Sequence, residues 1–302
     1  QVAAQLRAFG ARIETTNGTL PATVRGTPDP QTRRFILVSP SAQIKTALLL
    51  AGVFGNVPIA ILGDKASRDH TERLLRYLGA DITFDRASVV LRSMPAIFQD
   101  IDVAGDFSAA AFFIVAATIA PESSIVIERV GVNPTRTGLL DALVQMGAKI
   151  RLENQRELCG EPVADIAVES AELRGISVSA DVALRAIDEI LVLAVAAAFA
   201  QGETRITGVR ELRTKESDRL AAIERLLNAA GINVETLPNG IAIHGGTPRS
   251  QGAIVETHDD HRTAMAAAAL AAGAGPLAID DESSIDVSFP SFTQTLRKAQ
   301  QP

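Results

Sequence analysis

The chain has 302 residues, of which 47% are apolar and 21% charged, and its formal net charge is −6. These values exclude a mostly disordered chain, and the length suggests two domains. The 29 Lys and Arg are outnumbered by 35 Asp and Glu, and Trp is absent, so a nucleic-acid-binding protein is disfavoured. The single cysteine, Cys159, excludes an internal disulfide and a cysteine-based metal cluster, and favours a reducing compartment.

Membrane and secretion signals are not visible in the sequence. The longest uninterrupted apolar run, residues 190–200, has about half of the ~20 residues that a membrane-spanning helix needs. The first residues are amphipathic and lack a basic start followed by an apolar block, which a signal peptide would show. We therefore expect a cytoplasmic protein without a membrane partner.

Amphipathic helices that end at a glycine recur along the chain. The pattern predicts them, each with a following strand, at residues 3–14, 71–84, 139–153 and 221–236. A glycine just past a helix suits the left-handed residue that closes the last turn. The glycines that we expect in this role are Gly10, Gly79, Gly147 and Gly231.

Alanine-rich helices alternate with the amphipathic ones, and each follows a polar loop and leads into a short strand. The loops begin near Ser41, Gly105, Asp188 and Asp260. Alanine loses little side-chain entropy on packing, so we expect these helices to be buried on most sides.

The two patterns together form a repeat of about 65–85 residues: polar loop, buried helix, strand, amphipathic helix, glycine turn and two strands. This order predicts an α/β (α+β) protein with mixed sheets. The chain opens inside the second helix of one repeat and closes after the first half of another. We therefore expect that an N-terminal part is missing; the alternative is that the first helix is an N-terminal cap.

The segment 210–220, RELRTKESDRL, is the most charged part of the chain. If it is helical, Lys215 and Arg219 share one face, and Glu216 lies one turn before Arg219. Two cations on one face can hold a dianionic ligand, and a carboxylate between cations keeps a low pKa and can transfer protons. The alternative is a solvated helix whose ion pairs each contribute a few tenths of a kcal/mol.

The segment 257–265, THDDHRTAM, places His258 and His261 around two carboxylates. This is weak zinc spacing without further ligands, so we expect no metal. Asp260 is expected to cap a helix that starts near Arg262, which leaves Arg262 facing an anion. The sequence has no phosphate-binding G-x-x-x-x-G-K-[ST] loop, no G-x-G-x-x-G and no G-x-S-x-G.

Six segments, in this order, carry a resemblance to a known family: SAQIKTALLLAG, SRDHTE, VAGDFSAAAFF, the Ile-Asp-Glu of AIDEI, ELRTKESDRL and DDHRTAM. The chain resembles the 3-phosphoshikimate 1-carboxyvinyltransferase (EPSP synthase) family over essentially all of its length. The resemblance implies a two-domain enolpyruvyl transferase fold of repeated β-α-β-α-β-β units. Residues 1–103 would be the remainder of the substrate-binding domain, and residues 104–302 a second, nearly complete three-repeat domain.

The resemblance also implies a reaction of the shikimate pathway of aromatic amino acid biosynthesis. The enolpyruvyl group of phosphoenolpyruvate moves to the 5-hydroxyl of shikimate 3-phosphate, and phosphate leaves, with neither a metal nor an organic cofactor. Family members are mostly monomers. The residues implied to bind substrates are Ser41, Ala42, Gln43, Arg68, Lys215, Arg219 and Arg262. The residues implied to be catalytic are Asp188 and Glu216, with Asp260 and His261 as support for Arg262.

Three departures from the family pattern are visible. Asp188-Glu189 is followed by Ile190-Leu191 instead of the usual aromatic residue and proline, and Val287 occupies a position where some members have a lysine. The family's N-terminal Asp-Lys-Ser and Arg-Arg-Pro-Met segments, which contact phosphoenolpyruvate and the inhibitor glyphosate, are also absent. We therefore expect little turnover from this chain alone, and exposed sheet edges that favour aggregation.

Two other functions are possible for the same pattern. UDP-N-acetylglucosamine enolpyruvyl transferase has the same fold and chemistry, but KESDRL and DHR-x-A-M favour the shikimate enzyme. A protein that keeps the fold without catalysis would be expected to lose charged site residues, whereas this chain keeps all of the following: Asp188, Lys215, Glu216, Arg219 and Arg262.

Overall fold

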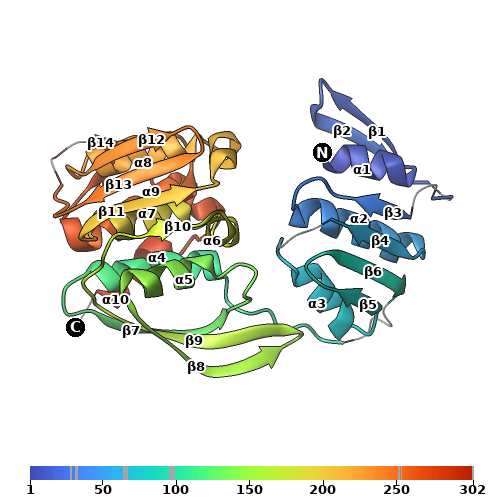
Figure 1. The fold of residues 1–302 in the computed structure, drawn as a ribbon, viewed down its shortest axis with the longest axis horizontal. Coiled ribbons are helices and arrows are strands. Elements are labelled where there is room, and N and C mark those ends of the chain that lie inside the picture. Colours follow the sequence, from blue (N-terminus) through green and yellow to red (C-terminus); the bar gives the residue numbers. More distant parts are fainter. Residues whose placement is uncertain are drawn as a thin grey trace. The chain divides into compact units, whose positions relative to one another are not determined.

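The structure is a computed structural model that describes residues 1–27, 29–30, 33–63, 67–94, 99–250, 252 and 254–300. It divides into two compact units (Figure 1). Unit 1 comprises Gln1–Val103 and Glu157–Glu161, and unit 2 comprises Ala104–Arg156 and Pro162–Pro302. Each unit is described separately below.

Unit 1 begins with the second half of a repeat and continues with a whole one. Helix α1 (Val2–Phe9) leads into an antiparallel pair, β1 (Arg12–Thr16) and β2 (Thr19–Arg25). The complete repeat then follows as β3 (Arg34–Ile36), α2 (Ala42–Gly55), β4 (Ile59–Leu62), α3 (His70–Tyr77), β5 (Asp81–Phe84) and β6 (Ser88–Ser93). Its sheet has the order β3-β4-β6-β5, in which β3 and β4 are parallel and the other pairs antiparallel.

Unit 2 contains the repeat again, in whole or in part, at three places. The first is α4 (Phe107–Ile119), β7 (Ser124–Gly131), α5 (Gly138–Met146), β8 (Lys149–Leu158) and β9 (Glu161–Glu169). The second is β10 (Ser177–Val178), α6 (Ala180–Arg185), α7 (Ile190–Ala198), β11 (Gly202–Thr207), η1 (Arg210–Thr214), α8 (Arg219–Asn228), β12 (Asn233–Leu237) and β13 (Gly240–Gly245). The third is β14 (Ile254–Val255), α9 (His261–Ala274), β15 (Ala278–Ile279), η2 (Ser283–Val287) and α10 (Phe292–Ala299).

The sheet topology confirms the repeat predicted from the sequence. The order β10-β11-β13-β12 in unit 2 reproduces β3-β4-β6-β5 in unit 1, with the same parallel first pair and antiparallel later pairs. The predicted turn glycines all have positive φ: Gly10 (119°), Gly79 (88°), Gly147 (98°) and Gly231 (77°). The last repeat extends further than the sequence indicates, because α10 follows its first half.

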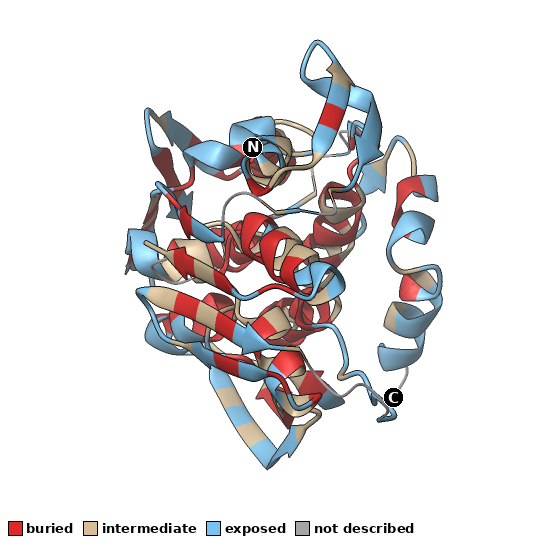
Figure 2. Ribbon diagram, turned by 90° about the vertical axis from the view of Figure 1, so that its right-hand side faces the viewer, coloured by how far each residue is buried: buried red, intermediate tan, exposed pale blue. Residues whose placement is uncertain are grey.

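The alanine-rich helices of unit 2 are its core. Every residue of α7 is buried, as are all but one of the residues of α4, and α4, α7 and α9 pack against one another (Figure 2). The expectation that all four such helices are buried on most sides is wrong for α2. This helix buries one face, with Leu48 and Leu49 fully covered, but Phe54 is 85% exposed. Within the described residues of unit 1, no second helix of this kind packs against it.

Within the described residues, no helix is both long enough and apolar enough to cross a bilayer.

Candidate active site

The starts of three core helices meet in unit 2. Asp106 caps α4 by accepting the N–H groups of Ser108 and Ala109, and Asp260 caps α9 by accepting the N–H of Arg262 (2.9 Å). Glu189 occupies the residue before α7, and its carboxylate accepts the hydroxyl of Ser108. Helix N-termini carry partial positive charge and unsatisfied N–H groups, so their convergence favours anions.

Arg219 is the buried centre of the charged cluster. Its side chain is 2% exposed, and its Nε donates to Asp260 Oδ2 at 2.9 Å. Its Nη2 lies 2.6 Å from Glu216 Oε2, and its Nη1 lies 3.9 Å from Asp188 Oδ1. Burial alone would raise the pKa of Asp260, but the hydrogen bonds and charge of Arg219, with a further hydrogen bond from Ser217, lower it below its ordinary value. The cluster therefore holds a buried anion and cation as a charged pair.

The helix assumed for Lys215 and Arg219 in the sequence analysis is wrong. Lys215 follows the short 3₁₀ helix η1 in an extended conformation (φ −80°, ψ −156°), and α8 begins only at Arg219. The break arises because Asp218 caps α8 with its carboxylate, which accepts the N–H groups of Leu220 and Ala221. The two cations nevertheless converge, because both approach the same carboxylate oxygen of Asp188.

Asp188 lies where the cations meet. Its Oδ1 is 3.6 Å from Lys215 Nζ, and its main-chain oxygen accepts Arg262 Nη1 at 2.9 Å. The Asp188 side chain is 16% exposed, so the carboxylate is reachable from solvent, and Lys215 and Arg219 lie 3.6 Å and 3.9 Å from it. The nearby Glu216 is 57% exposed. One partly exposed carboxylate surrounded by cations, beside a second and more exposed one, can bind anions and exchange protons.

Arg262 and His261 form the first turn of α9. The Arg262 side chain is 16% exposed, and its Nη1 lies 3.9 Å from Glu189 as well as on the carbonyl of Asp188. The pKa of His261 is lowered, first by burial and then by the positive charge of Arg262. The capping role that the sequence predicts for Asp260 is confirmed, and it fixes the start of the helix that carries Arg262.

Sequence reasoning missed a second charged group beside this cluster. Arg136, in the loop between β7 and α5, donates through Nη2 to Ser108 Oγ (2.7 Å) and to Glu189 Oε1 (3.2 Å). The Glu189 side chain is 3% exposed. Its burial raises its pKa, against the opposing charge of Arg136. The position of Glu189 in the sequence could have indicated this group. A charged residue directly before a wholly apolar helix is expected to have a buried partner.

The remaining candidates lie in unit 1 at the start of α2. Ser41 caps this helix by accepting the N–H of Ile44 at 3.3 Å, Ala42 is its first residue, and Gln43 is exposed. Arg68 is half-buried in the segment before α3. Lys45 ties the two segments together, because its Nζ lies 2.6 Å from Glu72 of α3 and 3.5 Å from the carbonyl of Ser67. The polar segment DKASRDHTE spans residues 64–72, and its residues 64–66 lie outside the described residues.

The departures noted in the sequence have simple structural forms. α7 begins at Ile190 without a proline, and Ile190 and Leu191 are both buried. Val287 ends η2 and is 84% exposed. As for metals, the described residues include no group of three or more His, Cys, Asp or Glu side chains arranged to hold an ion.

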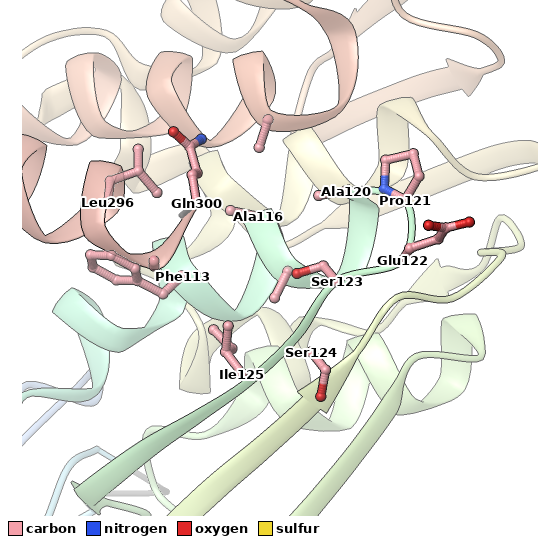
Figure 3. Close-up of a pocket in the computed structure, with 13 residues that line it drawn as sticks. Phe113, Ala116, Ala120, Pro121, Glu122, Ser123, Ser124, Ile125, Leu296 and Gln300 are labelled. Atoms are coloured by element: carbon pink, nitrogen blue, oxygen red, sulfur yellow. The ribbon is translucent and has the colours of Figure 1, made fainter. Parts of the chain in front are cut away.

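A pocket of about 530 Å³ lies at the other end of α4. Phe113, Ala116 and Ala120 line it together with Ile125 of β7 and Leu296 of α10 (Figure 3). α4 has 13 residues and is therefore about 20 Å long, and Ser108, which contacts Glu189 and Arg136, is in its first turn. The pocket contains none of the candidate site residues, so the site is defined by the charged cluster.

The chain is similar in sequence to known proteins. The sequence model for "EPSP synthase (3-phosphoshikimate 1-carboxyvinyltransferase)" matches residues 1–296. The 3-phosphoshikimate 1-carboxyvinyltransferase of Gloeobacter violaceus is 45% identical over 100% of this chain and 70% of its own length. That of Desulforudis audaxviator is 49% identical over 87% of this chain and 62% of its own length. The curated relatives are thus matched over only part of their length.

Solved structures give the same answer. The EPSP synthase of Acinetobacter baumannii matches 99% of this chain with a TM-score of 0.87 and 38% identity, over 69% of its own chain. The enolpyruvyl transferase NikO of Streptomyces tendae matches with a TM-score of 0.72 at 16% identity, which supports the fold alone. These matches confirm the fold and the resemblance that the six sequence segments indicate.

Proposed function

Because this chain belongs to the EPSP synthase family, we propose that it transfers the enolpyruvyl group of phosphoenolpyruvate to the 5-hydroxyl of shikimate 3-phosphate, releasing phosphate. The observation that carries the proposal is the position of Asp188. Its carboxylate lies 3.6 Å from Lys215 and 3.9 Å from Arg219, and its carbonyl is held by Arg262. Two strongly anionic substrates require such a group of cations, and the transferred protons require a carboxylate among them.

We assign the cations to the two substrates as the family resemblance implies. Arg219 and Arg262 bind the phosphate and carboxylate of phosphoenolpyruvate, since a guanidinium can form paired hydrogen bonds to such groups. Lys215 binds shikimate 3-phosphate beside Asp188. In unit 1, the family resemblance implies a phosphate-binding role for Ser41, Ala42, Gln43 and Arg68, and the first turn of α2 suits a phosphate group.

In the proposed chemistry, one carboxylate donates a proton and the other accepts one. Glu216 donates a proton to the methylene carbon of phosphoenolpyruvate while the 5-hydroxyl oxygen attacks its central carbon and Asp188 takes the hydroxyl proton. This gives a tetrahedral intermediate whose developing charge is stabilised by Arg219 and Lys215. The bond from the central carbon to the phosphate oxygen then breaks as the departing phosphate takes the proton from Asp188. Glu216 takes a proton back from the methyl group, and phosphate and the enol ether product are released.

Phosphate release from phosphoenolpyruvate plus shikimate 3-phosphate tests the proposal, with UDP-N-acetylglucosamine as the control acceptor. The chain is assayed alone and mixed with the N-terminal segment of a full-length relative, because it spans 62% and 70% of the two curated relatives. We expect release only with the shikimate acceptor. Release only with UDP-N-acetylglucosamine would assign the other transferase, and no release by the folded chain under either condition would contradict the proposal.

Matched variants test the carboxylate roles. Asp188→Asn and Glu216→Gln keep side-chain size but remove the charge, and each is expected to lower kcat by about 10²–10⁴-fold. Glu203→Gln is the control, because Glu203 forms only an exposed pair with Arg205 on β11 and a longer contact to His244. Equal activity of Asp188→Asn and the control would remove Asp188 from the mechanism.

A further inference from the structure

Glu189 is a buried carboxylate for which the proposed chemistry has no use. It directly follows Asp188, its side chain is 3% exposed, and it precedes the wholly buried helix α7. A carboxylate in such a place loses its hydration, so it destabilises the fold unless cations and hydrogen-bond donors compensate. The groups that contact Glu189 therefore indicate the role of this carboxylate.

The first compensation comes from the repeat that contains α4 and α5. Ser108, on the first turn of α4, donates its hydroxyl to Glu189 Oε1. Arg136, from the loop before α5, donates Nη2 to the same oxygen at 3.2 Å and also to Ser108 Oγ at 2.7 Å. Its Nη1 reaches Asp106, the cap of α4, at 3.3 Å. One guanidinium thus joins the start of α4 to the residue before α7.

A second arginine shares the same carboxylate. Arg262 of α9 places Nη1 3.9 Å from Glu189 Oε1 and donates that nitrogen to the carbonyl oxygen of Asp188 at 2.9 Å. Within the described part of the chain, Nη1 is the one nitrogen of this guanidinium that donates to the protein. The charge of Glu189 therefore attracts Arg262 to the main chain of Asp188 and leaves its other nitrogens for a ligand.

We propose that Glu189 and Arg136 are positioning residues, which together hold Arg262 against Asp188 so that the phosphoenolpyruvate-binding guanidinium and the carboxylate base keep a fixed separation. This inference rests on the proposed function for the roles of Asp188 and Arg262. Neither residue needs to touch a substrate, because Glu189 is enclosed and Arg136 uses its terminal nitrogens on Ser108, Asp106 and Glu189.

Crystal structures of the full chain test the positioning directly. Glu189→Gln keeps the length and an acceptor for Ser108 but removes the charge that attracts Arg262. We expect Arg262 Nη1 to leave the carbonyl of Asp188, so that their separation exceeds 3.5 Å, the limit of a hydrogen bond. Glu203→Gln is the control, and it is expected to leave the contact at 2.9 Å. An unmoved Arg262 in Glu189→Gln would overturn the proposal.

A double-mutant cycle on substrate binding tests the partnership. Glu189→Gln and Arg136→Gln are each expected to weaken phosphoenolpyruvate binding, measured by calorimetry and as KM, by about 10–100-fold, as for other residues that orient a ligand-binding group. The double variant is expected to be no weaker than either single variant, because both act through one contact. Additive losses would overturn the partnership.

The cycle separates positioning from a purely structural role. A structural role lowers the amount of folded protein and leaves the KM of the folded fraction unchanged, whereas positioning raises KM for phosphoenolpyruvate. If Glu189→Gln fails to fold, Ser108→Ala replaces it. This variant removes two hydrogen bonds, one to Glu189 and one from Arg136, but leaves Glu189 paired with Arg136, and it is expected to raise KM by a few-fold. An unchanged KM in Ser108→Ala would then overturn the proposal.

Failure of the proposed function would look different. If the wild-type chain neither binds phosphoenolpyruvate nor releases phosphate, the proposed function is wrong, and the double-mutant cycle on substrate binding cannot be measured. The crystal structures then still decide whether Glu189 fixes Arg262 against Asp188, since that distance is measured without substrate.

Discussion

Units 1 and 2 have the same β-α-β-α-β-β topology, but the alanine-rich helix of this topology is buried to different extents in the two units. In unit 2, α4, α7 and α9 pack against one another; α4 and α7 are buried almost throughout, and every residue of α9 is at least partly buried. In the described part of unit 1, α2 is the one helix of this kind, and Phe54 on its outer face is 85% exposed. Composition therefore predicts that such a helix can be buried, while the number of repeats packed around it decides whether it is.

The units also differ in how they hold a buried ion pair. In unit 1, Lys45 lies 2.6 Å from Glu72, and burial raises the pKa of Glu72 despite the lysine's charge. In unit 2, Arg219 lies 2.9 Å from Asp260, and the pKa of Asp260 is lowered although burial opposes this. Asp260 accepts from Arg219, Ser217 and the N–H of Arg262, so several donors stabilise its charge.

Replacing the cation of each buried ion pair should give the largest difference in stability between the two units. Arg219→Met leaves Asp260, whose side chain is 0% exposed, without its charge partner, and we expect a loss of about 3–5 kcal/mol in the free energy of unfolding. Lys45→Met should cost less, because the raised pKa of Glu72 lets it take up a proton instead. Hydrogen exchange of α9 and α3 amides, read segment by segment, measures each unit separately.

Arg225→Met provides a control on the same helix as Arg219, in its last turn. If Arg219→Met costs no more than this control, or no more than Lys45→Met, the contrast between the two buried pairs is wrong.

Packing density is the next contrast. A Cβ on Gly273 of α9 would lie 2.7 Å from two ring carbons of Phe199, so Gly273→Ala should destabilise unit 2 by about 1–3 kcal/mol. A Cβ on Gly55 of α2 would lie 3.6 Å from Phe9 in ordinary contact. Gly55→Ala should then be neutral or stabilise unit 1 by up to about 1 kcal/mol. Urea unfolding of both variants measures the difference, and equal losses would show that α2 is as tightly packed as α9.

The pH dependence of the two pairs should have opposite sign. Since the folded pKa of Asp260 is depressed, its stability contribution is present above the ordinary aspartate pKa of 3.8 and is lost as pH falls through the folded pKa. Since the pKa of Glu72 is raised, its contribution is present below 4.5 and is lost as pH rises through the folded pKa. Stability curves of Asp260→Asn and Glu72→Gln against wild type from pH 3 to 8 would show this. Two differences of the same sign would contradict it.

Much of the fold was predictable because short sequence patterns mark the elements of the repeat. The glycines Gly79 and Gly147 mark helix ends since a left-handed residue is needed there, and the alanine-rich runs mark core helices. The exposed face of α2 was not predictable, because burial depends on packing partners that the helix's own sequence does not specify. The extended Lys215 was also missed, because Asp218 can serve equally as a helix-interior residue or as a cap.

The candidate site was predictable where motifs are contiguous in sequence. Arg219 and Glu216 are three residues apart, and their pairing at 2.6 Å follows from proximity. Arg136 and Glu189 are 53 residues apart and meet only because α4 and α7 pack with their starts together. Neither residue type nor spacing encodes that meeting, so it required the three-dimensional structure.

The smallest expected effect tests the opening contrast itself. Phe54→Ser removes an aromatic ring that is 85% exposed on α2, so the free energy of unfolding should change by less than about 0.5 kcal/mol. Urea unfolding at two protein concentrations measures this. A loss above about 2 kcal/mol would mean that the outer face of α2 is covered in solution, since only buried aromatic surface contributes that much. The difference between the units would then lie in what covers each helix. In both units, the alanine-rich helix would be stabilised by packing on every face.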